Sequence, residues 1–228
     1  MQPYFFPYIG YFQLINHVDT FILYDDVNFI KKGWINRNNI LQKGKSELIT
    51  IPLSKASQNK KINEILLHNK NQSQKMFFER IQFNYKEAPF FHKTMDIISE
   101  VFSKNHLTIS ELSSQSIKTT SQYLSMDTEF KLSSIEYTAT KDLKKAERLI
   151  EITKLNGAVN YINPEGGKKI YDKNYFKKFG INLNFMKCSI DTYQQFNNIP
   201  VKGLSIIDVL MFNSPSEINK MLLNFEII

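Results

Sequence analysis

The last third of the chain repeats one order of elements, in which a helix ends at a glycine and a short apolar strand follows. Helices are predicted over residues 141–155 and from about 171 to 179, and Gly157 and Gly180 end them. The strands that follow cover 158–162 and 181–185, and Phe130-Lys131-Leu132 forms an earlier short strand. Such units are typical of a parallel α/β sheet. The sequence therefore predicts an α/β fold with a Rossmann-like, three-layer parallel sheet.

The opening of the chain places polar groups close to a predicted strand end. Pro3 and Pro7 stiffen an aromatic loop, and Gly10 opens a helical segment over residues 11–18. The apolar run 20–24 predicts a buried strand that ends at Asp25-Asp26. Open α/β sheets bind ligands at the carboxyl ends of their strands, which makes both carboxylates candidates for a site. Alternatively, the aspartates form a solvated turn and the aromatic side chains are packing residues.

The middle of the chain predicts a hairpin followed by helices. Residues 30–41 and 46–53 flank the turn Gln42-Lys43-Gly44-Lys45. The simplest interpretation of this pattern is a β-hairpin, which would lie beside the helix and strand at the start of the chain. Helices are expected over 73–85, 89–103 and from 109 to about 124, so the region of about 73–125 is helical. We expect a single domain that covers residues 1–228.

Composition limits the cellular compartment and the classes of partner that we expect for this protein. No apolar run reaches the roughly 18 residues of a membrane span, and the start lacks a signal peptide, so we expect a cytoplasmic protein. A single cysteine, Cys188, excludes an internal disulfide, and the scattered histidines predict no metal. The net charge of +7 favours anionic partners such as sugar nucleotides, RNA or anionic lipid headgroups. The lysines are dispersed over helical segments, which is more typical of solvated faces than of a nucleic-acid patch.

Three further places in the sequence hold candidate site residues. Trp34 stands beside Asn36, Arg37 and Asn38, a mixture that either stacks on a planar group and binds an anion or packs against the fold. After a predicted strand, Glu165-Gly166-Gly167 precedes two lysines and forms either a backbone anion site or a plain turn. Asp208 lies in the apolar helix predicted over 204–212 and needs a partner, as a helix-end acceptor or as part of the site.

Together these segments resemble the WbqC-like protein family over nearly the whole chain. The motifs that carry the resemblance are Gln2-Pro3-Tyr4, Pro7-Tyr8-Ile9-Gly10-Tyr11, Tyr24-Asp25-Asp26-Val27-Asn28-Phe29, Gly33-Trp34-Ile35-Asn36-Arg37-Asn38, Ala88-Pro89-Phe90-Phe91, Tyr161, Gly166-Gly167, Tyr171 and Leu204-Ser205-Ile206-Ile207-Asp208. The resemblance implies a role in bacterial surface polysaccharide (O-antigen) biosynthesis. Some members carry the label glycine transferase, which implies acylation of an amino sugar. Members usually have a short apolar strand before the Gln-Pro-Tyr segment, and Met1 stands where that strand would end.

A weaker resemblance links the opening to the HIGH-motif nucleotidyltransferases. Tyr8-Ile9-Gly10-Tyr11 overlays the tetrapeptide of that superfamily, with tyrosine in both histidine positions. Histidines there donate to phosphates during nucleotidyl transfer. Tyrosine hydroxyls donate hydrogen bonds but do not become cations near neutral pH. The sequence therefore favours binding of a nucleotide-linked substrate over active nucleotidyl transfer.

The function predicted from the sequence is a transferase that attaches a small acyl group, such as glycine, to the amine of a nucleotide-linked amino sugar. The expected catalytic residues are Asp25 or Asp26 as general base, with Lys32 and Arg37 to hold the pyrophosphate or acyl carboxylate. The residues expected to bind substrate are Gln2, Tyr4, Tyr8, Gly10, Tyr11, Trp34, Asn36, Asn38, Glu165, Gly166, Gly167, Ser205 and Asp208. No cofactor is expected. An aminoacyl-tRNA acyl donor and a homodimer remain open, as do the alternatives of a non-catalytic scaffold for polysaccharide assembly and a HIGH-like nucleotidyltransferase.

Overall fold

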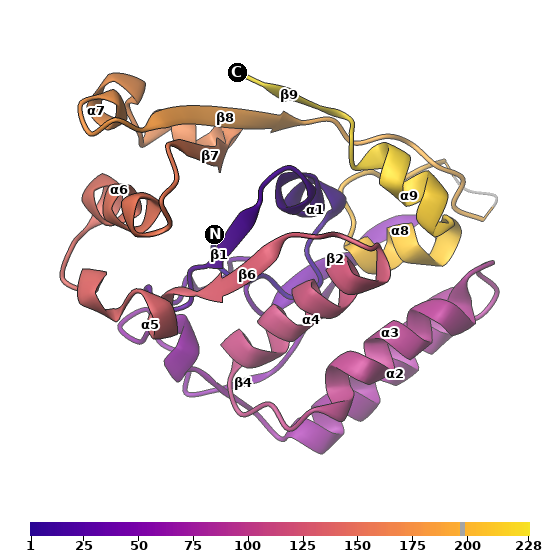
Figure 1. Cartoon of the computed structure of the whole chain (residues 1–228). Coiled ribbons are helices and arrows are strands. Elements are labelled where there is room, and N and C mark those ends of the chain that lie inside the picture. Colours follow the sequence, from indigo (N-terminus) through magenta and orange to yellow (C-terminus); the bar gives the residue numbers. More distant parts are fainter. Residues whose placement is uncertain (197–198) are drawn as a thin grey trace.

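A computed structural model describes residues 1–196 and 199–228 and shows a mixed α/β protein (Figure 1). Its strands are β1 (Thr20–Leu23), β2 (Arg37–Gln42), β3 (Lys45–Thr50), β4 (Leu53–Ser54), β5 (Leu66–Leu67), β6 (Glu129–Leu132), β7 (Asn160–Pro164), β8 (Asn182–Cys188) and β9 (Phe225–Ile227). Its α-helices are α1 (Ile9–Asn16), α2 (Lys70–Tyr85), α3 (Phe91–Ser103), α4 (Ile109–Tyr123), α5 (Ser133–Glu136), α6 (Lys145–Leu155), α7 (Lys173–Lys177), α8 (Ile206–Phe212) and α9 (Pro215–Met221).

The strand that precedes the two aspartates forms a parallel pair with a strand from the second half of the chain. β1 pairs with β6 in a register that sets Thr20 opposite Glu129 and Leu23 opposite Leu132. Met1 also bonds to β1 and to the residue after it, because its amino group donates to Ile22 O and its carbonyl accepts from Tyr24 N, both at 2.6 Å. The parallel register brings the segment after β6 beside the segment after β1, and this juxtaposition builds the site described below.

A second sheet has the order β7-β8-β9. β7 and β8 are parallel, and β9 is antiparallel to β8 with Met186 opposite Ile227. The α/β class is confirmed, but the two parallel pairs lie in different sheets, so the three-layer Rossmann-like arrangement is not confirmed. The β1–β6 pair cannot extend this sheet at β8, because both edges of β8 are already paired. β7 pairs with one edge, and the C-terminal residues 225–228 pair with the other.

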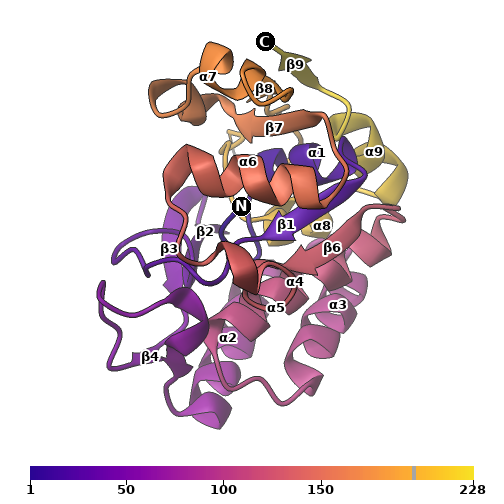
Figure 2. The same cartoon turned by 60° about the vertical axis from the view of Figure 1, so that its left-hand side comes forward.

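The predicted hairpin and the predicted helical region are both present, but residues 30–36 of the predicted first arm form a turn, and only Arg37–Gln42 is a strand there. β2 and β3 are antiparallel and are joined by Lys43 and Gly44, which both have positive φ (48° and 72°), as a tight two-residue turn requires. Figure 2 shows this hairpin on one side of the molecule, with α2, α3 and α4 below the β1–β6 pair. α3 and α4 lie within the predicted bounds, and α2 begins at Lys70, three residues before its predicted start.

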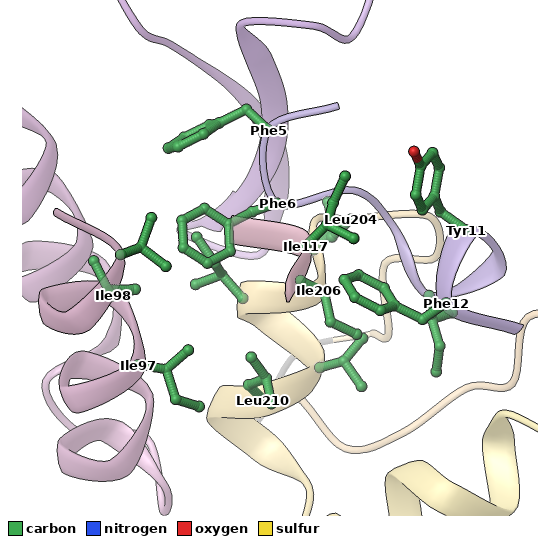
Figure 3. Close-up of a cluster of buried hydrophobic side chains, with 14 of the residues drawn as sticks. Phe5, Phe6, Tyr11, Phe12, Ile97, Ile98, Ile117, Leu204, Ile206 and Leu210 are labelled. Atoms are coloured by element: carbon green, nitrogen blue, oxygen red, sulfur yellow. The ribbon is translucent and has the colours of Figure 1, made fainter. Parts of the chain in front are cut away.

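The aromatic side chains of the opening loop form part of the main core. Phe5 and Phe6 are 1% and 0% exposed. Figure 3 shows Phe6 in one cluster with Ile98 of α3 and Ile206 of α8. Removing such side chains from water is the main contribution to folding free energy. The opening loop is therefore fixed by its own rings, and the polar atoms that it carries are held in place with it.

Candidate functional site

The carboxylate of Asp25, directly after β1, is held by the segment that follows β6. Asp25 Oδ1 accepts from Ser134 N at 3.0 Å and lies 3.1 Å from Ser133 Oγ, and Oδ2 accepts from Ser134 Oγ at 2.7 Å. Ser110 Oγ on α4 lies 3.4 Å from Oδ2. Asp25 is 3% exposed. Its oxygens are therefore occupied by hydroxyl and amide donors, which fix α5 and α4 to the end of β1.

Asp26 forms a buried ion pair with an arginine from α6. Asp26 Oδ2 lies 2.5 Å from a guanidinium nitrogen of Arg148, and the two side chains are 7% and 5% exposed. Arg148 Nε also donates to Thr140 Oγ1 at 3.0 Å, and Ser133 Oγ lies 2.5 Å from Asp26 Oδ1. Burial by itself raises the pKa of Asp26, but the hydrogen bonds from Arg148 and Ser133 and the charge of Arg148 outweigh burial, so this pKa is lowered. Asp26 is therefore ionised near neutral pH.

Tyr24 packs on this ion pair, and two further tyrosines, Tyr161 and Tyr171, lie near Tyr24. The guanidinium carbon of Arg148 lies 4.7 Å from the ring centre of Tyr24, a cation–π contact. Burial raises the pKa of Tyr24, Tyr161 and Tyr171, and the phenols of Tyr171 and Tyr24 add to the effect at Tyr161. Each phenol is thus protonated near neutral pH. We call Tyr24, Asp26, Arg148, Tyr161 and Tyr171 the tyrosine–arginine cluster.

The sequence predicted Asp26 but assigned no site role to Arg148, Tyr161 or Tyr171, although both tyrosines belong to the family motifs. The spacing of α6 does carry a signal for Arg148, because it stands four residues before Ile152 and both side chains are buried. A guanidinium at an apolar position requires an anionic partner, by the same argument that the sequence analysis applied to Asp208.

The tyrosines of the opening loop lie around the start of α1. Tyr11 is 1% exposed, and its hydroxyl donates to Gln2 O at 2.8 Å. The rings of Tyr4 and Tyr11 have centres 5.7 Å apart. Tyr8 precedes α1, and burial, with smaller effects of Cys188 and Tyr4, raises its pKa to about 12.

Gly10 is required by the ring of Tyr8. A Cβ at Gly10 would lie 2.3 Å from Cε2 of that ring, so no larger side chain fits. The Sγ atom of Cys188, at the end of β8, donates to the carbonyl of Gly10 at 3.3 Å. These contacts explain the glycine by packing, and they place β8 against the start of α1.

The turn after β7 carries Glu165, Gly166 and Gly167. Gly167 is buried, and a Cβ there would lie 2.2 Å from Oδ1 of Asn163, whose Nδ2 donates to Tyr161 Oη at 2.8 Å. A Cβ at Gly166 would meet nothing within 4 Å. Glu165 is exposed and lies 3.9 Å from Lys168. Gly167 is thus linked through Asn163 to the tyrosine–arginine cluster.

The polar residues of the hairpin bind main-chain carbonyls. Arg37 Nε donates to Gly33 O at 2.9 Å, and another guanidinium nitrogen donates to Lys32 O. Asn36 Nδ2 donates to Ile51 O at 2.8 Å, and Asn38 Nδ2 donates to Phe6 O at 2.6 Å. Arg37 therefore holds the turn before β2, whereas Asp25 and Asp26 have their partners on α5 and α6, and the structure does not join these two groups.

Ser205 and Asp208 stand at the start of α8 among protein partners. Ser205 caps the helix, and its hydroxyl donates to Phe6 O at 2.7 Å. Asp208 accepts from Tyr193 Oη at 2.6 Å, from Gln195 Nε2 at 2.6 Å and from Tyr85 Oη at 2.8 Å. Burial raises the pKa of Asp208, although the three hydrogen bonds oppose the shift.

A surface hollow of about 480 Å³ lies elsewhere, beside α9; its lining residues are Asp191, Glu217, Lys220, Met221, Leu223 and Asn224. Across residues 1–196 and 199–228, no set of histidine, cysteine and acidic side chains is grouped so as to hold a metal ion. Within the same residues, no helix has the length and apolar character needed to cross a bilayer.

Comparison with known proteins identifies the family of this chain. The chain matches the WbqC-like protein family over residues 2–220, and it belongs to that family. It is 28% identical over 222 residues to "Uncharacterized protein Rv1507c" of Mycobacterium tuberculosis, which covers 95% of this chain and 93% of that protein. No solved structure matches the chain. Membership in this family suggests a function related to polysaccharides.

Proposed function

We propose that this protein is a transferase of bacterial surface polysaccharide biosynthesis that attaches a small acyl group, such as glycine, to the amine of a nucleotide-linked amino sugar. The observation that carries the proposal is the tyrosine–arginine cluster, in which Arg148 of the buried Asp26–Arg148 pair packs on the half-buried Tyr24, and the half-buried Tyr171 lies near Tyr24. Membership in the WbqC-like family supports the polysaccharide context.

Arg148 and the tyrosines supply binding in this proposal. A guanidinium is a fixed fork of donors that suits phosphate and carboxylate oxygens. Protonated phenols add hydroxyl donors, and the ring of Tyr24 offers an apolar face to a sugar. Asp26 orients Arg148, and it neutralises the guanidinium while the site is empty.

Asp26 is also the proposed proton acceptor. The amine nitrogen attacks the acyl carbon, a C–N bond forms, the bond to the leaving group breaks, and the proton lost by the nitrogen passes to Asp26. When the phosphate or carboxylate of the substrate engages Arg148, the hold of Arg148 on Asp26 weakens, and the carboxylate becomes more basic. Asp25 serves as a positioning residue, since its oxygens are occupied by Ser133 and Ser134.

The other predicted anion contacts receive less support from the geometry. The donors of Arg37 are engaged by the carbonyls of Lys32 and Gly33, and Lys32 and Trp34 lie on the same exposed turn. We therefore leave these residues outside the proposed catalytic centre. The hydroxyl of Tyr11 is buried on Gln2 O, which argues against a phosphate-binding Tyr8–Tyr11 pair and hence against HIGH-like nucleotidyl transfer.

A thermal-shift screen of nucleotide-linked amino sugars tests the binding step, since a ligand that binds only the folded state raises Tm. We expect one such compound to raise Tm of the wild type, and Tyr171→Phe to weaken its binding about tenfold, the cost of one hydrogen bond to a charged group. Tyr175→Phe on α7 is the matched control, because its ring packs on Phe179 outside the cluster.

Mass spectrometry then tests the chemistry. The wild type, incubated with the bound sugar nucleotide and an activated glycine donor, is expected to give an N-acylated product, and Asp26→Asn to give none while it still binds the sugar. The proposal is wrong if no sugar nucleotide shifts Tm, or if Asp26→Asn and the wild type form product at equal rates.

A further inference from the structure

Two lysine-rich segments that are distant in the sequence lie side by side near the end of β1. Phe29 N donates to Lys60 O at 2.9 Å, and Asn28 and Lys61 form an antiparallel bridge. Lys31 and Lys32 follow the first segment, so this pairing brings them toward Lys60 and Lys61 at the surface. All four side chains are exposed.

The same turn exposes two large apolar side chains. Ile30 is 50% exposed and Trp34 is 43% exposed, whereas Phe29 at the base of the turn is 4% exposed. Gly33 N donates to Ile30 O at 3.1 Å, and Arg37 holds the carbonyls of Lys32 and Gly33. The turn is therefore anchored from beneath and carries its apolar side chains outward. We call Ile30, Lys31, Lys32, Trp34, Lys60 and Lys61 the basic turn.

Among the residues that the structure describes, no acidic side chain forms an ion pair with the four lysines of the basic turn. Over residues 1–196 and 199–228, the ion pairs involve other cations: Lys75, Arg80, Lys86, Lys131, Arg148, Lys168 and Lys187. Glu64, three residues after Lys61, accepts from the main-chain N of Lys61 at 2.8 Å. Four unpaired ammonium groups around exposed apolar side chains form a surface that suits an anionic partner.

We propose that the basic turn docks the protein on an anionic lipid bilayer, with Trp34 and Ile30 at headgroup depth and the lysines on the lipid phosphates. Tryptophan favours the membrane–water interface, and lysines beside apolar anchors are the usual composition of surface-bound segments. RNA is less suited, because bases would stack on Trp34 but would leave the half-exposed side chain of Ile30 without an apolar partner. The inference does not rest on the proposed function.

Docking at this surface would place the tyrosine–arginine cluster close to the bilayer. Asp26 and Asn28 are two residues apart, and Asn63 N, just after the lysine pair, donates to Asp25 O at 3.1 Å. The segment that carries the basic turn is thus continuous with the end of β1. A substrate held in a membrane would meet the cluster from this side.

Trp34 is the only tryptophan of the chain, so its fluorescence reports on the basic turn directly. Vesicles of phosphatidylcholine with one third phosphatidylglycerol are expected to sediment the protein and shift its emission to the blue. Vesicles of phosphatidylcholine alone are expected to do neither. Binding should weaken steeply with added salt, because the lysine contacts are screened.

Lys31→Gln/Lys60→Gln is expected to weaken binding to the anionic vesicles at least tenfold, since each lysine contributes roughly fivefold. Lys177→Gln/Lys178→Gln is the matched control. Both lysines are exposed, on or just after α7, and α7 lies far from β4, the strand that precedes Lys60 and Lys61, in both views (Figures 1 and 2). Ile30→Ser should also weaken binding, whereas Phe83→Ser, at a 67% exposed position on α2, should not.

Two outcomes overturn the proposal. The first is equal loss of vesicle binding in the test and control lysine variants, which would assign the binding to net charge. The second is tight binding of a labelled single-stranded RNA that depends on Lys31 and Lys60 while anionic vesicles fail to shift Trp34 emission. That result would make the basic turn a nucleic-acid surface.

Discussion

Asp26 and Asp208 are both buried carboxylates, yet they have opposite surroundings. Asp26 is paired with a cation, Arg148, beside half-buried tyrosines, and its pKa is lowered. Asp208 is 0% exposed and accepts from three neutral donors, and burial raises its pKa. The difference separates a buried ion pair, which the proposed function makes the binding and proton-accepting site, from a hydrogen-bonded junction that joins parts of the fold.

The donors of Asp208 show what the junction connects. Tyr85 ends α2 and accepts at its hydroxyl from Leu41 N of β2 at 2.7 Å. Tyr193 and Gln195 belong to the connection between β8 and α8. One carboxylate thus joins the hairpin, α2, α8 and this connection. Its partners are protein groups, whereas in the proposed function Arg148 also engages an anion of the substrate.

The largest effect is expected from Arg148→Met, because it leaves Asp26 as a buried charge without a cation. Loss of one member of a buried ion pair costs about 3–5 kcal/mol of unfolding free energy. Urea denaturation measures the loss. Arg148→Met combined with Asp26→Asn should recover part of it, and a double variant as unstable as the single one would show that Arg148 acts through packing alone.

Tyr193→Phe is expected to have the next largest effect. It removes one donor from Asp208 and keeps the ring, so the loss should be about 1.5–3 kcal/mol, the range for a hydrogen bond to a charged group. Tyr171→Phe is the matched change in the tyrosine–arginine cluster and should alter the free energy of unfolding little, because Tyr171 is half-buried. Equal losses would remove the distinction between junction and site.

The sequence predicted the local elements well because their signals are local. The run that ends at Asp25, the hairpin turn at Lys43-Gly44, the three central helices and the apolar helix around Asp208 all appear close to the predicted bounds. Which strands pair is not a local property. The three residues of β9 carry too weak a pattern to show that the edge of β8 is occupied.

The site was predictable only in part, for the same reason. Asp26 follows from its place after β1, but its partner Arg148 is 122 positions away. Ser205 looked like a substrate contact, yet its hydroxyl donates to Phe6 O, 199 positions away. Gly10 suggested close approach of an anion, and in the structure the Tyr8 ring occupies that space. Residue types indicate what a group can bind, and only the fold determines which partner it meets.

Asp208→Asn is expected to cost about 1 kcal/mol or less, because two effects oppose each other. The amide keeps an oxygen for Tyr193 and Gln195 but loses an acceptor for Tyr85. In return, the variant no longer buries an ionised carboxylate. Guanidinium denaturation at pH 7 measures the balance. A loss above about 3 kcal/mol would indicate that Asp208 needs its charge, as Asp26 does.

The smallest effect, and the sharpest test of the comparison, is the pH dependence of stability. The pKa of Asp26 is lowered in the folded state, so its contribution is present above about pH 4 and is lost as pH falls through the folded pKa. The pKa of Asp208 is raised, so its contribution is complete below about pH 4 and is lost as pH rises through the folded pKa. Urea midpoints between pH 3 and 7 should therefore lose their acid-side slope in Arg148→Met/Asp26→Asn and gain stability toward pH 7, relative to the wild type, in Asp208→Asn. If both variants changed the slope in the same direction, the two carboxylates would have the same electrostatic role, and the contrast between a carboxylate paired with a cation and one held by neutral donors would be wrong.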